Sequence, residues 1–312
     1  MPLDSDVKRL LQMLAAGSMP EGSELTPAEM RRAVLRLAQA VDIRNIPIGK
    51  MEKRELSGPD GSLPVRIYIP TLVSPDKSAG LVYFHGGGGV FCSTETHDGL
   101  CRMLANDSGC RVISVDYRLA PEHKFPAAVE DSCFVTRWVS EHALELGIDP
   151  DRIAVGGDSA GGTLAAVVCQ LARQTGGPNL ALQVLFCPLT DANPDTESRK
   201  TYAERYFFDK TTIAWALRHY CQTGTDLADP RISPLRATDL AGLPPAHIHT
   251  AEFDPLRDEG KAYGDRLERA GVKVRYTCHE GMIHHFYGMA GVIPYARFAM
   301  KAAGKAIKES LV

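Results

Sequence analysis

The sequence contains no uninterrupted apolar run that approaches the roughly 18 residues of a membrane-spanning helix. Its first stretch, "MPLDSDVKRLLQML", has acidic residues before the basic pair and lacks the apolar core of a secretion signal. A formal net charge of -3 over 312 residues gives no electrostatic reason to expect nucleic acid or an anionic membrane as a partner. We therefore expect a chain without a membrane span that binds no nucleic acid.

The sequence also lacks any C-x-x-C pair, although it has 8 cysteines. They are scattered through the chain, at positions 92, 101, 110, 133, 169, 187, 221 and 278. This spacing argues against a zinc site and against a disulfide framework, so a reducing cytoplasm is the predicted location.

Residues 1–45 predict two helices that stand apart from the rest of the chain. The first has one stripe of apolar residues at helical spacing: Val7, Leu10, Leu11 and Leu14. The second begins at "TPAE", where Thr26 can cap the helix, Pro27 suits the first turn and Glu29 completes a capping box. Its own apolar stripe follows: Met30, Val34, Leu37 and Val41. Both stripes predict faces that cover another part of the protein.

The pattern changes at about residue 50. "MEKRELSG" and "LPVRIYIP" flank the turn signal at residues 58–61 and predict a hairpin. Short apolar runs then alternate with helical stretches: "GLVYFHG", "CRVISVDY", "RIAVGGD", "LQVLFCP", "AHIHTAEFD" and "KVRYTCHEG". Continuous apolar runs are typical of a parallel sheet buried on both faces, so the fold class is α/β. Residues 191–240 interrupt this alternation and read as an insertion.

The segment "RIAVGGDSAGGTLAAVVCQLARQ" reads as a strand, a tight turn at Ser159 and a helix. Gly157 to Gly161 fit the pattern G-x-S-x-G, in which a serine sits in a strained conformation between strand and helix. The pattern alone is weak and also fits a phosphate-binding turn or a simple tight corner. The strand before it and the helix after it favour a nucleophilic serine.

Four consecutive glycines follow an earlier strand in "FHGGGGVF", residues 84–91. Glycine runs are entropically unfavourable, so either this loop is merely flexible or bare backbone is needed there. The second interpretation is an oxyanion hole, where backbone N–H groups approach an acyl oxygen closely. The dinucleotide and P-loop glycine patterns do not fit this segment.

A nucleophilic serine needs a base and an orienting acid, and in α/β hydrolases the acid follows the serine in the chain and the histidine base follows the acid. Asp254 follows the run "AHIHTAEF", and the adjacent His284 and His285 follow the last run. Asp258 is the competing acid, but we expect it in the first turn of a helix, where its charge is favourable. A metal site is disfavoured, since H-E-x-x-x-H is one residue too long for the zincin motif.

These residues belong to a larger set of motifs. The chain resembles the hormone-sensitive-lipase-like (bacterial family IV) carboxylesterases of the α/β-hydrolase fold. Five segments carry the resemblance: "HGGG" (85–88), "VDYRLAPEHKFPAA" (115–128), "GDSAGG" (157–162), "DPLRDEG" (254–260) and "GMIHHF" (281–286). The resemblance implies a mostly parallel eight-stranded sheet flanked by helices, with a helical cap.

The resemblance also implies roles for particular residues. Ser159 would be the nucleophile, Asp254 the acid and His284 the base, with Gly87, Gly88 and Ala160 as oxyanion donors. The cap would comprise residues 1–45 and 191–240, and the hydrolase core residues 46–190 and 241–312. Aromatic residues of the insertion are candidates for the pocket lining, although each could equally serve cap packing: Tyr202, Tyr206, Phe207, Phe208 and Trp215.

Three positions depart from the family pattern. Gly89 stands where the family has Trp or Phe, which predicts a more open wall of the acyl pocket. Cys92 occupies a position that is usually glycine. His285 replaces the usual glycine after the base, and we expect it to point toward the cap or solvent, since adjacent side chains of an extended backbone diverge. Contact with the substrate pocket is the alternative for this residue.

The predicted function is a serine carboxylesterase that hydrolyses short- to medium-chain acyl esters through an acyl-enzyme. Its partner would be a small-molecule ester, and it would need no cofactor or metal. The same residues also suit an amide or lactone hydrolase. A non-catalytic small-molecule receptor on this fold is the alternative of another class, but receptors of that type lose a triad member. The oligomeric state is open, with a homodimer as the candidate.

Overall fold

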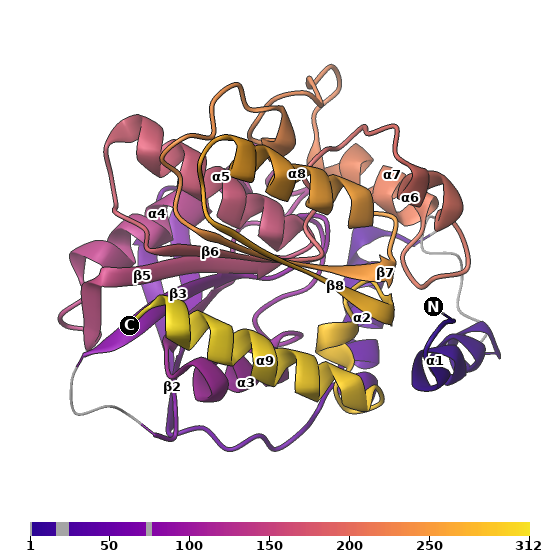
Figure 1. Cartoon of the computed structure of the whole chain (residues 1–312), viewed down its shortest axis with the longest axis horizontal. Helices are drawn as coiled ribbons and strands as arrows, with labels where there is room; N and C mark the ends of the chain where they lie inside the picture. Colours follow the sequence, from indigo (N-terminus) through magenta and orange to yellow (C-terminus); the bar gives the residue numbers. More distant parts are fainter. Residues whose placement is uncertain (1, 17–24, 73–76) are drawn as a thin grey trace.

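The computed structural model describes residues 2–16, 25–72 and 77–312, and within them eight strands form one sheet (Figure 1). The strands lie in the order β1-β2-β4-β3-β5-β6-β7-β8. Their bounds are β1 Lys50–Gly58, β2 Gly61–Ile69, β3 Ser78–Phe84, β4 Arg111–Val115, β5 Ile148–Asp158, β6 Leu182–Phe186, β7 Ala246–Phe253 and β8 Val274–Ile283. The strands β1 and β2 form the predicted hairpin, with Gly58 opposite Gly61. The pairs from β4 through β3 to β8 are parallel, so the predicted α/β-hydrolase sheet is confirmed.

Helices cover both faces of the sheet (Figure 1). On one face lie α3 (Asp98–Ser108) and α9 (Pro294–Ser310), and on the other α4 (Ala127–Glu141), α5 (Ala160–Thr175) and α8 (Arg257–Arg269). Side chains of β3 alternate between the two resulting cores, because Val82 packs in one hydrophobic cluster and Leu81 in the other. Every residue of β3 and β6 is buried, which explains why these strands are continuous apolar runs.

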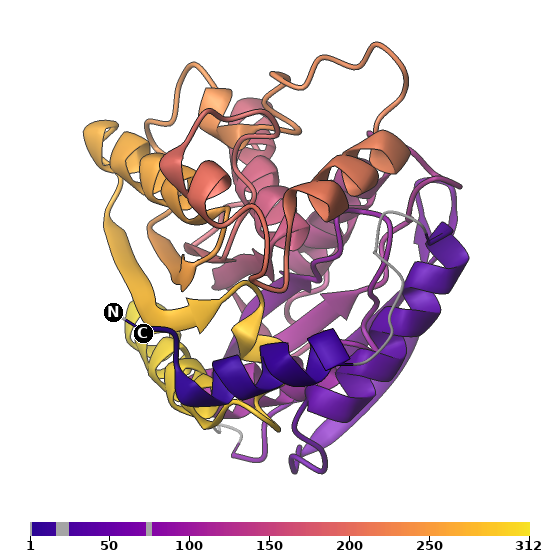
Figure 2. The same cartoon turned by 90° about the vertical axis from the view of Figure 1, so that its right-hand side faces the viewer.

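Four further helices lie beyond the carboxyl ends of the parallel strands, as the turned view shows (Figure 2). They are α1 (Ser5–Ala16), α2 (Pro27–Val41), α6 (Glu197–Thr201) and α7 (Lys210–Tyr220). The predicted capping box of α2 is present, since Glu29 N donates to Thr26 Oγ1 and Thr26 N donates to Glu29 Oε2. Two short 3₁₀ helices, η2 (Pro234–Arg236) and η3 (Phe286–Met289), complete the description.

The helix α2 packs against α7 although the two are far apart in sequence. Met30 of α2 shares a small hydrophobic cluster with Trp215 and Ala216 of α7. Val34 and Leu37, the middle of the predicted α2 stripe, are only partly buried and face a cavity. The α2 stripe therefore forms part of a cavity wall in addition to a packing surface. No helix within the described ranges is long and apolar enough to cross a membrane.

Candidate active site

Ser159 lies in the turn between β5 and α5, at the carboxyl edge of the sheet. Its φ of 53° and ψ of -120° place a non-glycine residue in strained backbone, as the G-x-S-x-G pattern predicts. The neighbouring glycines are sterically required, because a Cβ at Gly161 would lie 1.9 Å from the carbonyl oxygen of Phe84. The turn is held by a hydrogen bond from Ser159 N to the carbonyl of Phe186, 2.9 Å long.

His284 and Asp254 form a buried pair at the ends of β8 and β7. His284 Nδ1 lies 2.8 Å from Asp254 Oδ2, and the other carboxylate oxygen accepts from Leu256 N at 2.8 Å. Because an ionised carboxylate can only accept, Nδ1 carries the proton and Nε2 is left as the basic nitrogen. The ring of Phe208 stacks on His284 with centroids 4.3 Å apart, which fixes the plane of the imidazole.

The competing acid lies elsewhere. Asp258 is in the first turn of α8, as expected, and its carboxylate accepts from Ser198 N at 2.8 Å. Ser159 and His284 line the same cavity, and no direct hydrogen bond joins them among the residues that the structure describes. Hydrogen bonds of this kind are often long in a free enzyme and shorten when substrate binds.

The glycine loop after β3 has left-handed backbone at Gly87 (φ 98°) and Gly88 (φ 61°). A Cβ at Gly87 would lie 2.1 Å from the carbonyl oxygen of Phe91, so only glycine fits this turn. The turn is closed by hydrogen bonds from Val90 N and Phe91 N to the carbonyl of Gly87, at 2.9 and 3.0 Å. Gly88 lies with Ser159 on the walls of both cavities described below.

His85 supports this loop. Its ring stacks on Tyr117 with centroids 4.2 Å apart, and Nδ1 donates to the carbonyl of Gly86 at 2.8 Å. The hydroxyl of Tyr117 donates to the carbonyl of His85 at 2.7 Å. Complete burial lowers the pKa of His85 to about 4, so this imidazole is neutral and holds the loop in place.

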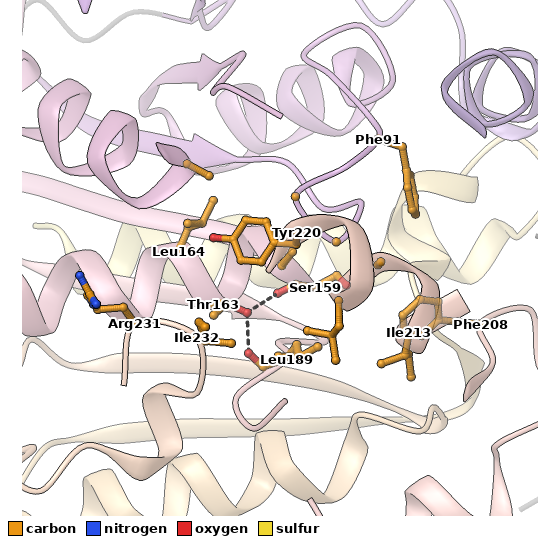
Figure 3. Close-up of a pocket in the computed structure, with 16 residues that line it drawn as sticks. Phe91, Ser159, Thr163, Leu164, Leu189, Phe208, Ile213, Tyr220, Arg231 and Ile232 are labelled. Atoms are coloured by element: carbon orange, nitrogen blue, oxygen red, sulfur yellow. Dashed lines mark hydrogen bonds between the residues drawn. The ribbon is translucent and has the colours of Figure 1, made fainter. Parts of the chain in front are cut away.

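Two cavities meet at Ser159. The smaller, shown in Figure 3, has a volume of about 50 Å³ and is lined mainly by apolar side chains of α5 and α7. The larger has a volume of about 250 Å³ and extends between α2, the loop before α7 and the start of η3. His284 lines the larger cavity, while Ala160, Leu164 and Tyr220 line the smaller one.

Only some of the predicted aromatic residues line these cavities. Phe207 and Phe208 lie on the wall of the larger one. Tyr202 and Tyr206 instead pack edge-on against each other, 5.3 Å apart, beside Phe253. Trp215 is also outside: it is 1% exposed, and its indole N–H donates to the carbonyl of Leu25. The positions of the aromatic residues in the sequence of the insertion do not show which of them face the site.

The wall beside Gly89 is not open, contrary to the prediction. A Cβ at Gly89 would lie 2.6 Å from the ring of Tyr220, so this aromatic ring of α7 fills the space next to the glycine. Figure 3 shows Tyr220 between Leu164 and Ser159 in the smaller cavity. The other departure, Cys92, has a φ of 67°, which explains why glycine suits that position.

The expected direction of His285 is also wrong. Its backbone is left-handed, with φ 58° and ψ 18°, so the argument from an extended chain does not apply. Its Nδ1 lies 3.0 Å from Oδ2 of Asp158, the residue that precedes the serine. His285 is thus turned inward and lies on the wall of the larger cavity, with a side chain that is 23% exposed.

Asp158 also binds His97, and the hydrogen bonds define the charge of that second histidine. The hydroxyl of Thr96 donates its only proton to the carbonyl of Ser93 at 2.9 Å. His97 Nδ1, 2.9 Å from that hydroxyl oxygen, must therefore donate to it. The other nitrogen, Nε2, lies 3.1 Å from Asp158 Oδ1, and the closeness of this carboxylate favours the positively charged form of His97.

The pKa shifts agree with this assignment. Burial opposes the charged form of His97, but the Asp158 carboxylate raises the pKa of this imidazole above its ordinary value. Burial likewise opposes ionisation of Asp158, yet the charge of His97 and the hydrogen bond from His285 hold its pKa well below the usual range. The pair is a buried ion pair, and it is further satisfied by Tyr83 Oη and Gly86 N on Oδ1.

Two groups of side chains within the described ranges have ligand atoms within 4.8 Å of one another and could hold a metal ion. They are His97, Asp158 and His285, and Cys187, Asp254 and His284. In both groups the aspartate–histidine hydrogen bonds already engage the same atoms.

Comparisons with known proteins agree with the fold and the esterase motifs. Residues 81–288 match the family model described as the alpha/beta hydrolase fold. The esterase LipI of Mycobacterium tuberculosis is 46% identical over 244 residues, 77% of this chain and 76% of that protein. The ethyl acetate hydrolase of Pseudomonas putida is 37% identical over 320 residues, covering 100% of both. A serine-to-alanine mutant of an α/β hydrolase from the metagenome of Lake Arreo, Spain, has a TM-score of 0.96 at 40% identity over 98% of each chain.

The fold and these relatives define the class as an α/β hydrolase. Within it, the chain belongs to the hormone-sensitive-lipase-like carboxylesterases and is a carboxylic ester hydrolase.

Proposed function

We propose that the chain cleaves esters in two steps, with Ser159 as nucleophile, His284 as base and Asp254 as orienting acid. Ser159 Oγ attacks the ester carbonyl while His284 Nε2 takes its proton, and the carbonyl oxygen becomes an oxyanion. His284 then gives the proton to the leaving alkoxide, and the acyl group remains on Ser159. Water, deprotonated by the same imidazole, attacks the acyl-enzyme and releases the carboxylic acid. The observation that carries the proposal is the buried Asp254–His284 pair, 2.8 Å apart, beside a serine in strained backbone.

The N–H groups of Gly87, Gly88 and Ala160 are the proposed oxyanion donors. The loop of Gly87 and Gly88 is held rigidly by hydrogen bonds and by the His85–Tyr117 stack. Ala160 begins α5, where backbone N–H groups lack partners within the helix. Donors that are fixed in advance stabilise a developing charge without reorganising, which is the main electrostatic contribution in such sites.

The position of His284 assigns the two cavities. Since His284 protonates the leaving oxygen, the alcohol part of the ester must lie beside it. His284 lines the larger cavity and not the smaller one. We therefore assign the larger cavity to the alcohol part and the smaller cavity, between α5 and α7, to the acyl part.

This assignment favours short to medium acyl chains. The acyl cavity is small, and Tyr220 occupies the space that Gly89 leaves free. The similarity to an ethyl acetate hydrolase supports the short end of this range. Residues 1–45 and 191–240 would form the cap, since they contribute Val34, Leu37, Phe207 and Phe208 to the wall of the alcohol cavity.

The small ester is the proposed partner, and a reducing cytoplasm remains the proposed location, because all 8 cysteines are free.

The test is Ser159→Ala, assayed with a series of p-nitrophenyl esters. We expect kcat to fall by about 10⁶, the loss for removal of a nucleophile in the subtilisin example of a triad. Ser57→Ala, an exposed position on β1, is the matched control and should keep full activity. A folded Ser159→Ala variant with turnover near that of the control would refute the assignment. Pre-steady-state measurements should also show a burst of p-nitrophenol from acylation.

A further inference from the structure

His285 presents a second anchored imidazole to the alcohol cavity. Its Nδ1 binds Asp158 at 3.0 Å, much as His284 binds Asp254 at 2.8 Å. Its position is fixed by the left-handed backbone and by Gly288, where a Cβ would lie 2.3 Å from His285 Nε2. Nε2 therefore sits against a glycine on the cavity wall and has no hydrogen-bond partner among the described residues.

The protonation of this ring follows from its partner. The Asp158 carboxylate can only accept, so His285 Nδ1 is the donor in their hydrogen bond. The charge of Asp158 is already matched by His97, whose Nε2 lies 3.1 Å from Oδ1. Burial is the main cause that lowers the pKa of His285 below its ordinary value, so the ring is neutral. In a neutral ring that is protonated at Nδ1, the remaining nitrogen Nε2 is an acceptor.

Most of the surrounding wall offers no polar group to a substrate. It consists largely of apolar side chains: Leu25, Met30, Val34, Leu37, Phe207 and Met289. The polar groups of Asp158, His97 and Thr96 are used by one another and by Tyr83, Gly86 and Ser93. Asp209 Oδ1 caps α7 by accepting from Thr212 N at 2.7 Å. Apart from the triad, the wall offers a substrate the acceptor Nε2, the hydroxyl of Thr212, the thiol of Cys92 and Oδ2 of Asp209, since both hydrogen bonds to Asp209 use Oδ1.

We propose that His285 Nε2 accepts a hydrogen bond from a donor on the alcohol part of the ester. This esterase would then prefer esters whose alcohol part carries a hydroxyl group, such as monoesters of diols. The inference rests on the proposed function, because it uses the assignment of the larger cavity to the alcohol part. Asp158 directly precedes Ser159, so a ring anchored on Asp158 lies near the reacting serine. The expected donor is a hydroxyl group one or two carbons beyond the ester oxygen.

The physical basis is that His285 Nε2 is an acceptor without a hydrogen-bond partner among the described residues. A polar group in an apolar pocket loses water when an alkyl chain enters and gains nothing in return, whereas a hydroxyl replaces the lost hydrogen bond. A site built to bond a hydroxyl discriminates against the isosteric alkyl group for this reason. His285 remains partly open to the cavity, so we expect a preference of about tenfold, the effect of one hydrogen bond.

The experiment compares three butanoate esters that share one acyl group: the 2-hydroxyethyl, propyl and 2-methoxyethyl esters. For the unmodified protein, kcat/KM should be about tenfold higher for the hydroxyethyl ester than for the propyl ester. The methoxyethyl ester, which has an acceptor but no donor, should behave like the propyl ester. In His285→Gly, which suits the left-handed backbone, the hydroxyethyl-to-propyl ratio should fall to within about twofold of one. His285→Asn, another residue that tolerates this backbone, should give the same loss, and thermal melts check both folds.

Thr212→Val is the control, because Thr212 lies on the same wall. The ratio should be unchanged in this variant, and a ratio that collapses here but survives in His285→Gly would assign the hydroxyl to Thr212 and overturn the proposal. A ratio near or below one in the unmodified protein would overturn it as well. Failure of the proposed function looks different: the propyl ester would then be cleaved equally well by Ser159→Ala.

Discussion

Truncation of Tyr220 tests what limits the acyl cavity. The ring of Tyr220 fills the space beside Gly89, where a Cβ would lie 2.6 Å away, and it lines the cavity together with Leu164. In Tyr220→Ala the ring is removed and the cavity extends toward α4 and the loop that carries Arg231 and Ile232. We expect the preferred acyl chain to become longer.

The magnitude follows from the burial of methylene groups. Each additional methylene that enters apolar space contributes about 0.8 kcal/mol, roughly fourfold in kcat/KM. The volume of a phenol ring accommodates at least two methylenes, so the ratio of octanoate to butanoate hydrolysis should rise by about 15-fold. The same truncation weakens packing against Phe125, whose ring lies 6.0 Å from that of Tyr220. A loss of about 2 kcal/mol in the free energy of unfolding is expected for this half-buried aromatic residue.

The assay measures kcat/KM for p-nitrophenyl acetate, butanoate and octanoate, well below the melting temperature of the variant. Tyr220→Phe is the matched control, since it keeps the ring and should keep the acyl profile. An octanoate-to-butanoate ratio that is the same in Tyr220→Ala and Tyr220→Phe would refute the assignment of this cavity to the acyl part.

Four further outcomes are expected. His284→Ala should lower kcat by about three to six orders of magnitude with the melting temperature nearly unchanged, and activity within tenfold of the unmodified protein would contradict its role as base. Gly88→Ala places a Cβ 2.6 Å from that of Ala216 and should reduce kcat by about 10² or more, whereas Gly177→Ala, with open space around it, should have no effect. The pKa of His97 is higher in the folded protein than in the unfolded chain, so above pH 6.5, the ordinary pKa of histidine, the unfolded chain loses this proton first. The free energy of unfolding should therefore fall as the pH rises above that value. His97→Gln should flatten that slope in denaturant titrations at several pH values, and an equal slope would exclude the ion pair as its cause. Deletion of residues 1–45 should change the alcohol preference more than the acyl preference, because α2 lines the alcohol cavity, and unchanged profiles in a folded variant would contradict the cap.

Much of the fold could be predicted because local sequence and tertiary position agree. The run "GLVYFHG" is continuously apolar because β3 is buried on both faces, and the hairpin turn at Pro59 and Asp60 is specified by its own residues. The candidate triad could be predicted for a related reason. Parallel strands bring their carboxyl ends to one edge, so Ser159, Asp254 and His284 each follow a strand and meet there.

The remaining features depend on contacts that no local pattern records. Tyr220 fills the space beside Gly89 through the packing of a helix that lies far along the chain. His285 turns toward Asp158 because its backbone is left-handed, a conformation that is uncommon for residues other than glycine and that the flanking sequence does not signal. Trp215 is a candidate for the pocket lining as an aromatic residue of the insertion, but the face of α7 that carries it packs against α2.

The contact between Gly89 and Tyr220 means that stabilisation of the charged intermediate and the shape of the acyl cavity depend on different segments of the chain. The glycine loop, anchored to the end of β5 by the Asp158 carboxylate, carries the groups proposed to stabilise the charged intermediate. The side chain that shapes the acyl cavity belongs instead to α7, outside that loop. Substitutions at Tyr220 are therefore expected to change which acids are released while the proposed oxyanion donors stay in place. Acyl selectivity in this chain can therefore change, by engineering or by evolution, through substitutions that leave the catalytic groups intact.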